Sequence, residues 1–489
     1  MNRLLIGMAI ICGLAGAAAG QPAPLDDEPE QTIRLAVRPA DTGERALIWP
    51  LLPEFTDTVD GDAGPLYRKA LQALERAKAD GDDLSEDLDR WLEMPLDELP
   101  AERALATIDK AAGKALEHIT AAARHTRVAW DQKVREKGLA ALMPNLGDVR
   151  YATRLLCARA RARIAQGRFD AAVADYQTCL AMARHVAAGE TLINALVGMA
   201  VVSMTLEQID RLIEQDTTPN LYWSLTDLPR PLVSLGPGLR TERLGWIIVM
   251  EHVDKLTDLS EPLDPATARK LLLEDSSRMR LQSIQDNGNE PKVDAGFGLM
   301  VMSHYPQARR WLLDKGWSRQ KIDAYPQAQV SMAFVHHQHR YWMDELTKWH
   351  SVAYHEARQP LRQLSERFEK ALADRTVNRV TALMTPALAR AYELEARVHR
   401  RLAALRVIEA IRLHAARHDG QLPANLNQIT EVPVPIDPLS GKPFQYAVDD
   451  GSFTLEAPLL EGMDRRDAGL RYEVNVAAPQ QAQRPRTPR

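Results

Sequence analysis

Histidines that could bind a metal ion gather in one stretch of this sequence, VHHQHRYWMDELTKWHSVAYHE. The stretch holds five of the chain's 13 histidines: His336, His337, His339, His350 and His355. On a helix, His336 and His339 would share a face with Met343 one turn further along, and imidazole nitrogens of this kind bind zinc. His350 lies eleven residues beyond His339, which is about 16 Å along a helix and too far for the same ion.

The stretch lacks the other features of a metal site. His337 and His355 fall on other faces of such a helix, zinc takes three or four ligands, and no HExxH motif supplies them. The large apolar residues around the histidines have the spacing of a packed helix face: Tyr341, Trp342, Met343, Leu346 and Trp349. We therefore interpret the histidines as the margin of that face, and we assign no metal-binding, catalytic or cofactor-binding residue and no cofactor.

Other local catalytic motifs are missing from the sequence. It contains no GxSxG elbow, no GxxxxGK[ST] phosphate loop, no GxGxxG after a strand and no CxxC. The stretch LGPGLRT, residues 235–241, has two glycines but no lysine. Glu393 and Glu395 lie on a charged helix, where we expect them to be solvated. An enzyme is therefore disfavoured, and a metal-dependent hydrolase that uses His336 and His339 is kept as an alternative.

The charge pattern argues against nucleic acid as a partner. The 489 residues carry 61 basic and 66 acidic side chains, for a formal net charge of −5, and the two signs are mixed along the chain. No run of basic residues is interleaved with aromatic residues. With 45% hydrophobic residues, the composition is that of a globular protein with a large core.

The first twenty residues are typical of a secretory signal peptide. Arg3 is followed by an apolar run from Leu4 to Ala19 and by small residues up to Gly20, which predicts cleavage before Gln21. Retention as a membrane anchor is the alternative. Ile11 precedes Cys12, which excludes a lipoprotein signal. We therefore expect an exported protein, periplasmic or associated with the cell envelope.

Later segments predict neither a membrane span nor a disulfide framework. The most apolar one, Leu192–Met204, is too short to cross a bilayer and is expected to be a buried core helix. Beyond the signal only Cys157 and Cys179 remain, which fits two small buried side chains, although their pairing stays open. The oligomeric state is also left open.

The chain divides into a short β segment, a long helical region and a turn-rich end. Residues 21–31 are expected to be a linker, and residues 32–60 a segment with a β-hairpin between TIRLAVR (32–38) and ALIWPLL (46–52), joined by the turn residues PADTGE. From 61 to 400 the apolar residues follow the three-and-four spacing of helices, as at Ile108, Ala112 and Leu116, with short breaks between runs. We predict a mainly α fold, an array of antiparallel helical hairpins.

Residues 401–476 are expected to form a small α+β module, followed by a disordered tail at 477–489. Asp419 and Gly420 end a helix. Phe444, Tyr446 and Val448 alternate as in a strand, as do the residues after the turn at 449–451, and a third strand is expected around Tyr472.

One helical hairpin resembles the core of a tetratricopeptide repeat. In AQGRFDAAVADYQTCL, residues 165–180, Gly167 lies at the tight turn, Ala172 where the helices approach, and Tyr176 and Leu180 on the packing face. The sequence contains no clear second copy at the period of 34 residues that such repeats have, so this is tetratricopeptide-like packing and not a repeat array.

The C-terminal module resembles the globular domain of the major pseudopilin of type II secretion. The matching residues are Gly420, Pro423, Asp437, Pro438, Gly441, Pro443, Tyr446, Gly451, Phe453 and Leu455. The prepilin signature and its long apolar helix are absent. Pseudopilins hold calcium in the loop after these strands, and the loop here offers Asp464 and Asp467 but has Arg465 and Arg466 between them and lacks the paired glycines, so we assign no calcium.

The whole chain is similar to a family of exported bacterial helical proteins that end in this module. The shared segments are IRLAVRPA, ARIAQGRFDAAVADYQTCLAMARH with the following ALVGMA, and KIDAYPQAQV. The resemblance implies the architecture and no activity. We expect a non-catalytic interaction protein whose partner is a protein or peptide. A second alternative, suggested by the terminal module, is an accessory of a secretion or pilus-like assembly.

Overall fold

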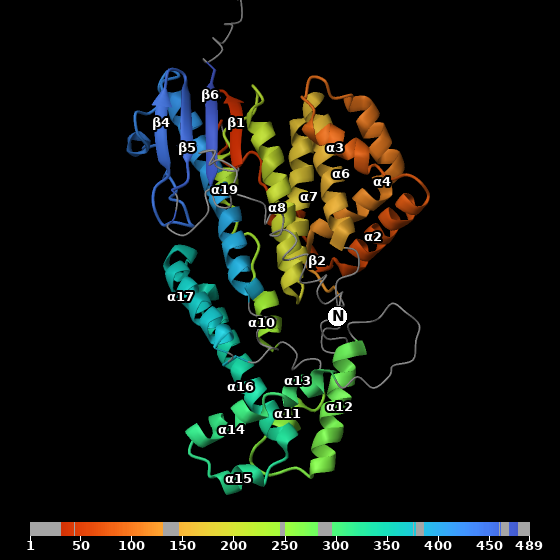
Figure 1. The fold of residues 1–489 in the computed structure, drawn as a ribbon. Helices are drawn as coiled ribbons and strands as arrows, with labels where there is room; N and C mark the ends of the chain where they lie inside the picture. Colours follow the sequence, from red (N-terminus) through yellow and green to blue (C-terminus); the bar gives the residue numbers. More distant parts are fainter. Residues whose placement is uncertain are drawn as a thin grey trace, which may run out of the picture.

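The computed structural model describes residues 31–43, 45–130, 146–244, 250–281, 296–374, 376–377, 386–458, 460 and 469–477. The protein is mainly α-helical, as predicted, with a small sheet built largely from its C-terminal end (Figure 1). The predicted signal peptide, nearly all of the linker, Asp464 and Asp467, and the tail beyond residue 477 lie outside the described residues.

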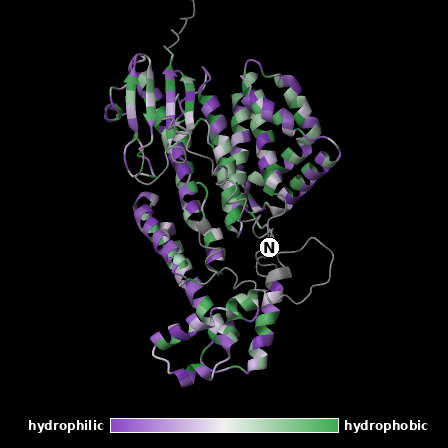
Figure 2. Ribbon diagram, viewed as in Figure 1, coloured by the Kyte–Doolittle hydropathy of each residue, from purple (hydrophilic) through white to green (hydrophobic). Residues whose placement is uncertain are grey.

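A bundle of antiparallel helices forms one side of the upper body (Figure 1). Its members are α2 (Gly64–Ala79), α3 (Ser85–Glu93), α4 (Ala101–Ala123), α6 (Leu146–Ala165), α7 (Phe169–Ala187) and α8 (Leu192–Ile213). The apolar spacing predicted their buried faces correctly, since Ile108, Leu156 and Leu206 are each fully buried. Burying such a side chain contributes about 1.5–3 kcal/mol, so these faces hold the bundle together (Figure 2).

Helices α6 and α7 form a hairpin at residues 165–180, where the sequence predicted one. Gly167 adopts φ +71° at the turn, a conformation that favours glycine, and Ala172, Tyr176 and Leu180 are fully buried. Cys157 and Cys179 face this core as free thiols.

Helix α8 is the most apolar helix of the bundle. Among the described residues it is long and apolar enough to cross a membrane, and 67% of its most apolar window is buried within the protein. It contacts α7 and α6 on one side and α19 (Pro386–Arg417) on the other, which is the position of a core helix, as predicted.

A lower lobe with its own hydrophobic core hangs below the upper body (Figure 1). It comprises α11 (Val253–Thr257), α12 (Pro265–Leu281), α13 (Gly296–Met302), α14 (Tyr305–Asp314), α15 (Arg319–Asp323) and the first half of α16 (Gln327–Thr347). Val330 and Phe334 of α16 belong to the lower core, while Trp342 and Leu346 belong to the main core. Helix α16 therefore links the two hydrophobic cores.

The C-terminal module forms around α19 and a four-stranded sheet. The strand order is β1-β6-β5-β4, with β4 (Gln445–Asp449), β5 (Ser452–Glu456) and β6 (Leu470–Val476) antiparallel, as their alternating residues predict. Strand β1 (Gln31–Val37) adds to the edge, parallel to β6, in a register that pairs Leu35 with Val474. The beginning and end of the described chain thus share one sheet.

The predicted hairpin of residues 32–38 with 46–52 is wrong. Residues 32–37 do form a strand, but its partner is β6, and residues 46–52 form turns and bends. Trp49 is buried and its indole N–H donates to Asp170 Oδ1 at 2.6 Å, while Pro50 interrupts any ladder. Packing onto α7 therefore outweighs strand pairing. The N-terminal strand pair is instead β2 (Val59–Asp62) with β3 (His125–Arg127).

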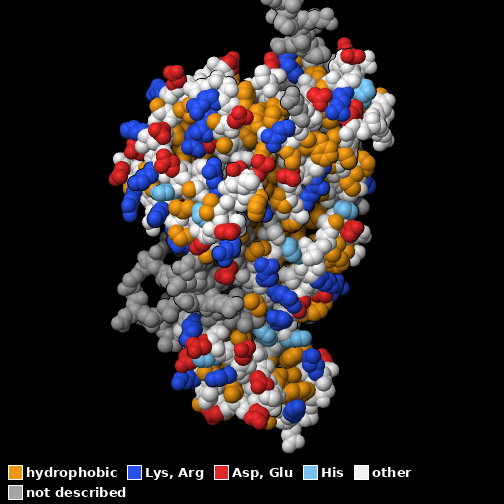
Figure 3. All heavy atoms as spheres, turned by 180° about the vertical axis from the view of Figure 1, so that it is seen from behind, with side chains coloured by type: hydrophobic (Ala, Val, Ile, Leu, Met, Phe, Trp, Pro, Cys, Tyr) orange, Lys and Arg blue, Asp and Glu red, His pale blue; other side chains and the backbone are white. Residues whose placement is uncertain are grey.

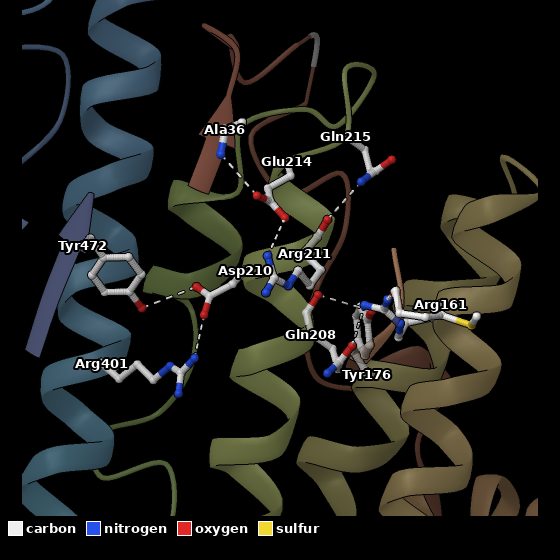
Figure 4. Close-up of polar contacts among 11 residues, drawn as sticks. Ala36, Arg161, Tyr176, Gln208, Asp210, Arg211, Glu214, Gln215, Arg401 and Tyr472 are labelled. Carbon is white, nitrogen blue, oxygen red and sulfur yellow. Dashed lines mark hydrogen bonds and ion pairs between the residues drawn. The ribbon is translucent and has the colours of Figure 1, made fainter. Parts of the chain in front are cut away.

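Buried ion pairs fasten α19 to its surroundings. Arg401 Nη2 lies 2.6 Å from Asp210 Oδ2 of α8, and the hydroxyl of Tyr472 on β6 donates to the other oxygen of Asp210 at 3.4 Å (Figure 4). The preceding residue, Arg400, makes a two-bond pair with Asp437 of the terminal loops. These pairs fix the helix, the bundle and the sheet relative to one another, because a buried charge is costly without its partner.

Candidate functional site

A cleft of about 510 Å³ lies where α19 meets three other segments of the chain. Its walls are the first half of α19, the turn η4 (Lys348–Ser351) with the start of α17 (Tyr354–Ala373), the loop at 230–234, and residues 436–438 of the terminal module. The volume lies within the roughly 300–1,000 Å³ of typical ligand sites. Because the walls come from distant parts of the chain, the cleft exists only in the assembled fold.

One face of α19 supplies the polar floor of the cleft. Tyr392, Glu395 and His399 follow the spacing of three and four residues that places side chains on one helix face. The hydroxyl of Tyr392 donates to the carbonyl oxygen of Leu346 at 3.2 Å, which ties α19 to the end of α16.

Glu395 is a half-buried carboxyl group, as is Glu393 on the same helix, and the expectation that both are solvated is wrong. One oxygen accepts a hydrogen bond from the backbone N–H of Leu235 at 3.4 Å. Burial raises the pKa of Glu395 to about 7, because the charged form loses water, and the bond from Leu235 only partly offsets this. Near neutral pH the side chain can therefore hold or release a proton.

His399 lies one turn further along α19, and its pKa is shifted in the opposite direction to that of Glu395. Its Nε2 accepts a hydrogen bond from the backbone N–H of Leu232 at 3.3 Å, so this nitrogen carries no proton. Burial, and secondarily the positive charge of Arg230, lowers the pKa of His399 to about 4. Glu395 and His399 thus both hold the 230–235 loop in place by accepting from its backbone.

Two of the five clustered histidines line the cleft. Helix α16 ends at Thr347, so His350 belongs to η4 and His355 to α17, and not to one continuous helix as expected. A Cβ on Gly236 would come within 2.8 Å of His350 Nε2, so only glycine allows the imidazole this position. Burial, and next Arg240, lowers the pKa of His350.

The other three histidines are on α16. His339 is fully buried, which lowers its pKa to about 4, and His336 is half-buried. His337 contacts Trp311 with the two rings tilted and their centroids 5.0 Å apart. The packed face predicted around them is confirmed at Trp342, Met343 and Leu346, whereas Tyr341 is exposed.

The structure brings together a different set of possible metal ligands, which sequence reasoning missed. Within the described part of the chain, the ligand atoms of His414, His418 and Glu431 lie within 4.8 Å of one another. The four-residue spacing of the two histidines on a helix was a visible signal. Glu431 lies in an irregular loop, and no local pattern indicates that it meets them.

The described part of the face drawn in Figure 3 shows no extended patch of one charge. On the face seen in Figure 3, basic and acidic side chains alternate with hydrophobic ones. This pattern suits recognition of a polypeptide better than of a polyanion.

Comparison with models of known families, with curated proteins and with solved structures finds no match to this chain. The resemblances to tetratricopeptide repeats, to pseudopilins and to a family of exported helical proteins therefore stay predictions from the sequence.

Proposed function

We propose that this chain is an exported, non-catalytic interaction protein that holds a segment of a partner polypeptide in the cleft beside α19. The observation that carries the proposal is the cleft itself, whose lining alternates aromatic surfaces with hydrogen-bonding groups. Trp349, Tyr354 and Tyr392 offer flat apolar contacts, and Ser234 and Ser351 offer hydroxyls. Aromatic residues are the side chains most enriched where proteins bind other proteins.

The electrostatics of the cleft also fit a peptide. Arg230 brings a positive charge to the lining and Glu395 brings a carboxyl group to the floor, which suits a chain with both backbone donors and acceptors. Ile436 is 50% exposed at the rim, and covering its apolar side chain with a ligand is favourable because it removes that surface from water. A small ion would use neither the groups of both charge types nor the apolar side chain of Ile436.

A rigid frame keeps the cleft in shape before a ligand arrives. The buried pairs of Arg400 with Asp437 and of Arg401 with Asp210 hold two of the four walls. Preorganised walls reduce the entropy lost on binding.

The chemistry of the cleft favours binding over catalysis. The polar groups of α19 in the cleft, Glu395 and His399, accept hydrogen bonds from the loop backbone, and among the described contacts neither bonds to Ser234 or Ser351. A general base must reach the group it activates. The hydrolase alternative at His336 and His339 receives no support from the structure. The described residues whose ligand atoms lie close enough to share an ion are His414, His418 and Glu431.

The pilus-like alternative is less favoured by the position of α19. Helix α19, which leads into the pseudopilin-like module, is covered by α8, α9 (Tyr222–Thr226) and α17. Arg400, Arg401 and Arg412 are buried along it. An assembly through this helix would have to break those contacts.

Partner binding is tested by photo-crosslinking in the native cell envelope. A photoreactive amino acid at Ala353, exposed on the cleft wall, should give one major crosslinked protein on irradiation. The same group at Ser260, exposed in the lower lobe, is the control and should give none. Equal crosslinking patterns from the two positions would refute the cleft as the binding site.

Export is tested on the protein purified from its own cells. We expect it in the envelope fraction with Gln21 as its first residue, because the small residues before Gln21 fit signal peptidase. N-terminal sequencing and intact mass decide the matter. A soluble cytosolic protein that still begins at Met1 would contradict export.

A further inference from the structure

The last turn of α19 and the loop after η5 (Leu426–Gln428) bring two imidazoles and a carboxylate together. His414 lies in the last turn of α19 and His418 directly after its end, with ring centroids 4.0 Å apart. Glu431 Oε1 lies 3.1 Å from His414 Nδ1 and 2.9 Å from His418 Nε2. The three side chains therefore converge on one point.

The carboxylate is held in place by its own loop. The backbone N–H of Thr430 donates to Glu431 Oε2 at 2.9 Å, and the neighbours Ile429 and Val432 are buried in the main core. Burial raises the pKa of Glu431, but hydrogen bonds from the backbone and from both imidazoles outweigh it and keep the pKa below its usual value. The group is thus an ionised, prepositioned ligand at neutral pH.

The backbone beyond α19 explains why the loop returns to the helix. Asp419 and Gly420 adopt φ +53° and +86°, which ends the helix and reverses the chain. The N–H of Gly420 donates to the carbonyl oxygen of Ala415 at 2.8 Å, which completes this helix end. The loop then runs back past the last turn and presents Glu431 to the two histidines.

We propose that His414, His418 and Glu431 form a binding site for a divalent transition metal ion of the zinc class. Two imidazoles and one carboxylate are a common zinc ligand set, with metal–ligand bonds of about 2.0–2.2 Å. Tetrahedral bonds of that length separate ligand atoms by about 3.4 Å, so the carboxylate oxygen, now 3.1 and 2.9 Å from the two nitrogens, would move only a few tenths of an ångström from each. The ion would replace the protons through which these nitrogens bond to Glu431.

Two of the three ligands are buried and one is exposed, which suits a metal site that is open to solvent on one side. The side chains of His414 and Glu431 are 9% and 8% exposed, while that of His418 is 51% exposed. The ion would enter past His418, and the fourth coordination position would face solvent. The hydrogen bond from Thr430 orients the carboxylate, as outer partners of metal ligands do.

A bound ion would fasten the terminal module to α19. The loop that carries Glu431 continues to Pro433, whose carbonyl oxygen accepts from the hydroxyl of Tyr222, and then to Ile436 and Pro438 on the cleft wall. The site is independent of the proposed partner binding, since its residues do not line the cleft.

The test uses the full-length protein, freed of metal with a chelator and titrated calorimetrically with Zn²⁺. We expect one ion per chain and a higher melting temperature with zinc. The His418→Ala and Glu431→Gln variants should bind at least about tenfold more weakly and lose the temperature shift. His118→Ala, which removes a half-buried histidine of α4, is the matched control and should bind as the wild type does.

Co²⁺ provides a spectroscopic check of the ligands. Four-coordinate Co²⁺ with imidazole ligands absorbs visible light much more strongly than hydrated Co²⁺, and this signal should disappear in His418→Ala. That variant changes a half-exposed side chain, so it should fold even if Glu431→Gln does not. Absence of saturable binding, or binding that is equal in the wild type and His418→Ala, would overturn the proposal and leave a hydrogen-bonded clamp without metal.

Discussion

The Asp437→Ala variant is expected to lose about 3–5 kcal/mol of unfolding free energy. Arg400 Nε and Nη2 lie 2.9 and 2.8 Å from the two oxygens of Asp437, and the paired side chains are 3% and 0% exposed. Asp437 also accepts from the backbone N–H groups of Leu439 and Ser440. Removal of the carboxylate therefore takes the ionised partner from a buried cation and the acceptor from two backbone donors.

Chemical denaturation measures this loss, and two controls identify its cause. Asp323→Ala removes the same side chain from an exposed pair with Arg309 and should cost no more than about 1 kcal/mol. A double variant, Arg400→Met with Asp437→Leu, should cost less than Asp437→Ala alone, because no charge stays buried. If Asp437→Ala costs as little as Asp323→Ala, the pair does not hold the terminal module.

The Glu395→Gln variant should be more stable than the wild type at pH 8 and lose this advantage on acidification. Glu395 has a folded pKa of about 7, raised mainly by burial. Its contribution to stability is full below the unfolded pKa of about 4.3 and is lost as the pH rises through 7. At pH 8 the wild type buries a charge that glutamine lacks, for a difference of about 2–3 kcal/mol between pH 8 and pH 4.

Denaturation of both proteins across pH 4–8 tests the sign of this effect. Glutamine keeps an oxygen that accepts from the N–H of Leu235, so packing changes little. Glu393→Gln is the control, because Glu393 is a partly buried carboxylate of the same helix that has a charged partner, Arg397. It should not gain stability as the pH rises. A difference between Glu395→Gln and wild type that stays constant with pH would contradict the raised pKa.

The helices could be predicted because their signal is local. Ile108, Ala112 and Leu116 reveal a buried face within three turns, and Asp419–Gly420 ends a helix by backbone preference alone. Strand β1 was found by its alternation, but its partner lies more than four hundred residues away, so the nearer segment at 46–52 was chosen instead. No local sequence pattern indicates that Trp49 packs on α7.

The candidate cleft could be predicted only in fragments. His350 and His355 drew attention as possible ligands, yet their shared surroundings come from a helix break at Thr347. Glu395 looks like one of many surface acids until the 230–235 loop covers it. Burial of this kind depends on tertiary contacts, which sequence periodicity does not encode.

The most direct test of the central claim is the affinity of the crosslinked partner for the purified protein and two tryptophan variants. Ser351→Trp fills the cleft from an exposed position, and Ser260→Trp adds the same ring to the lower lobe. The proposed function predicts that Ser351→Trp weakens binding at least about tenfold, while Ser260→Trp binds as the wild type does. Equal affinities for all three proteins would show that the partner, if it binds, does so elsewhere.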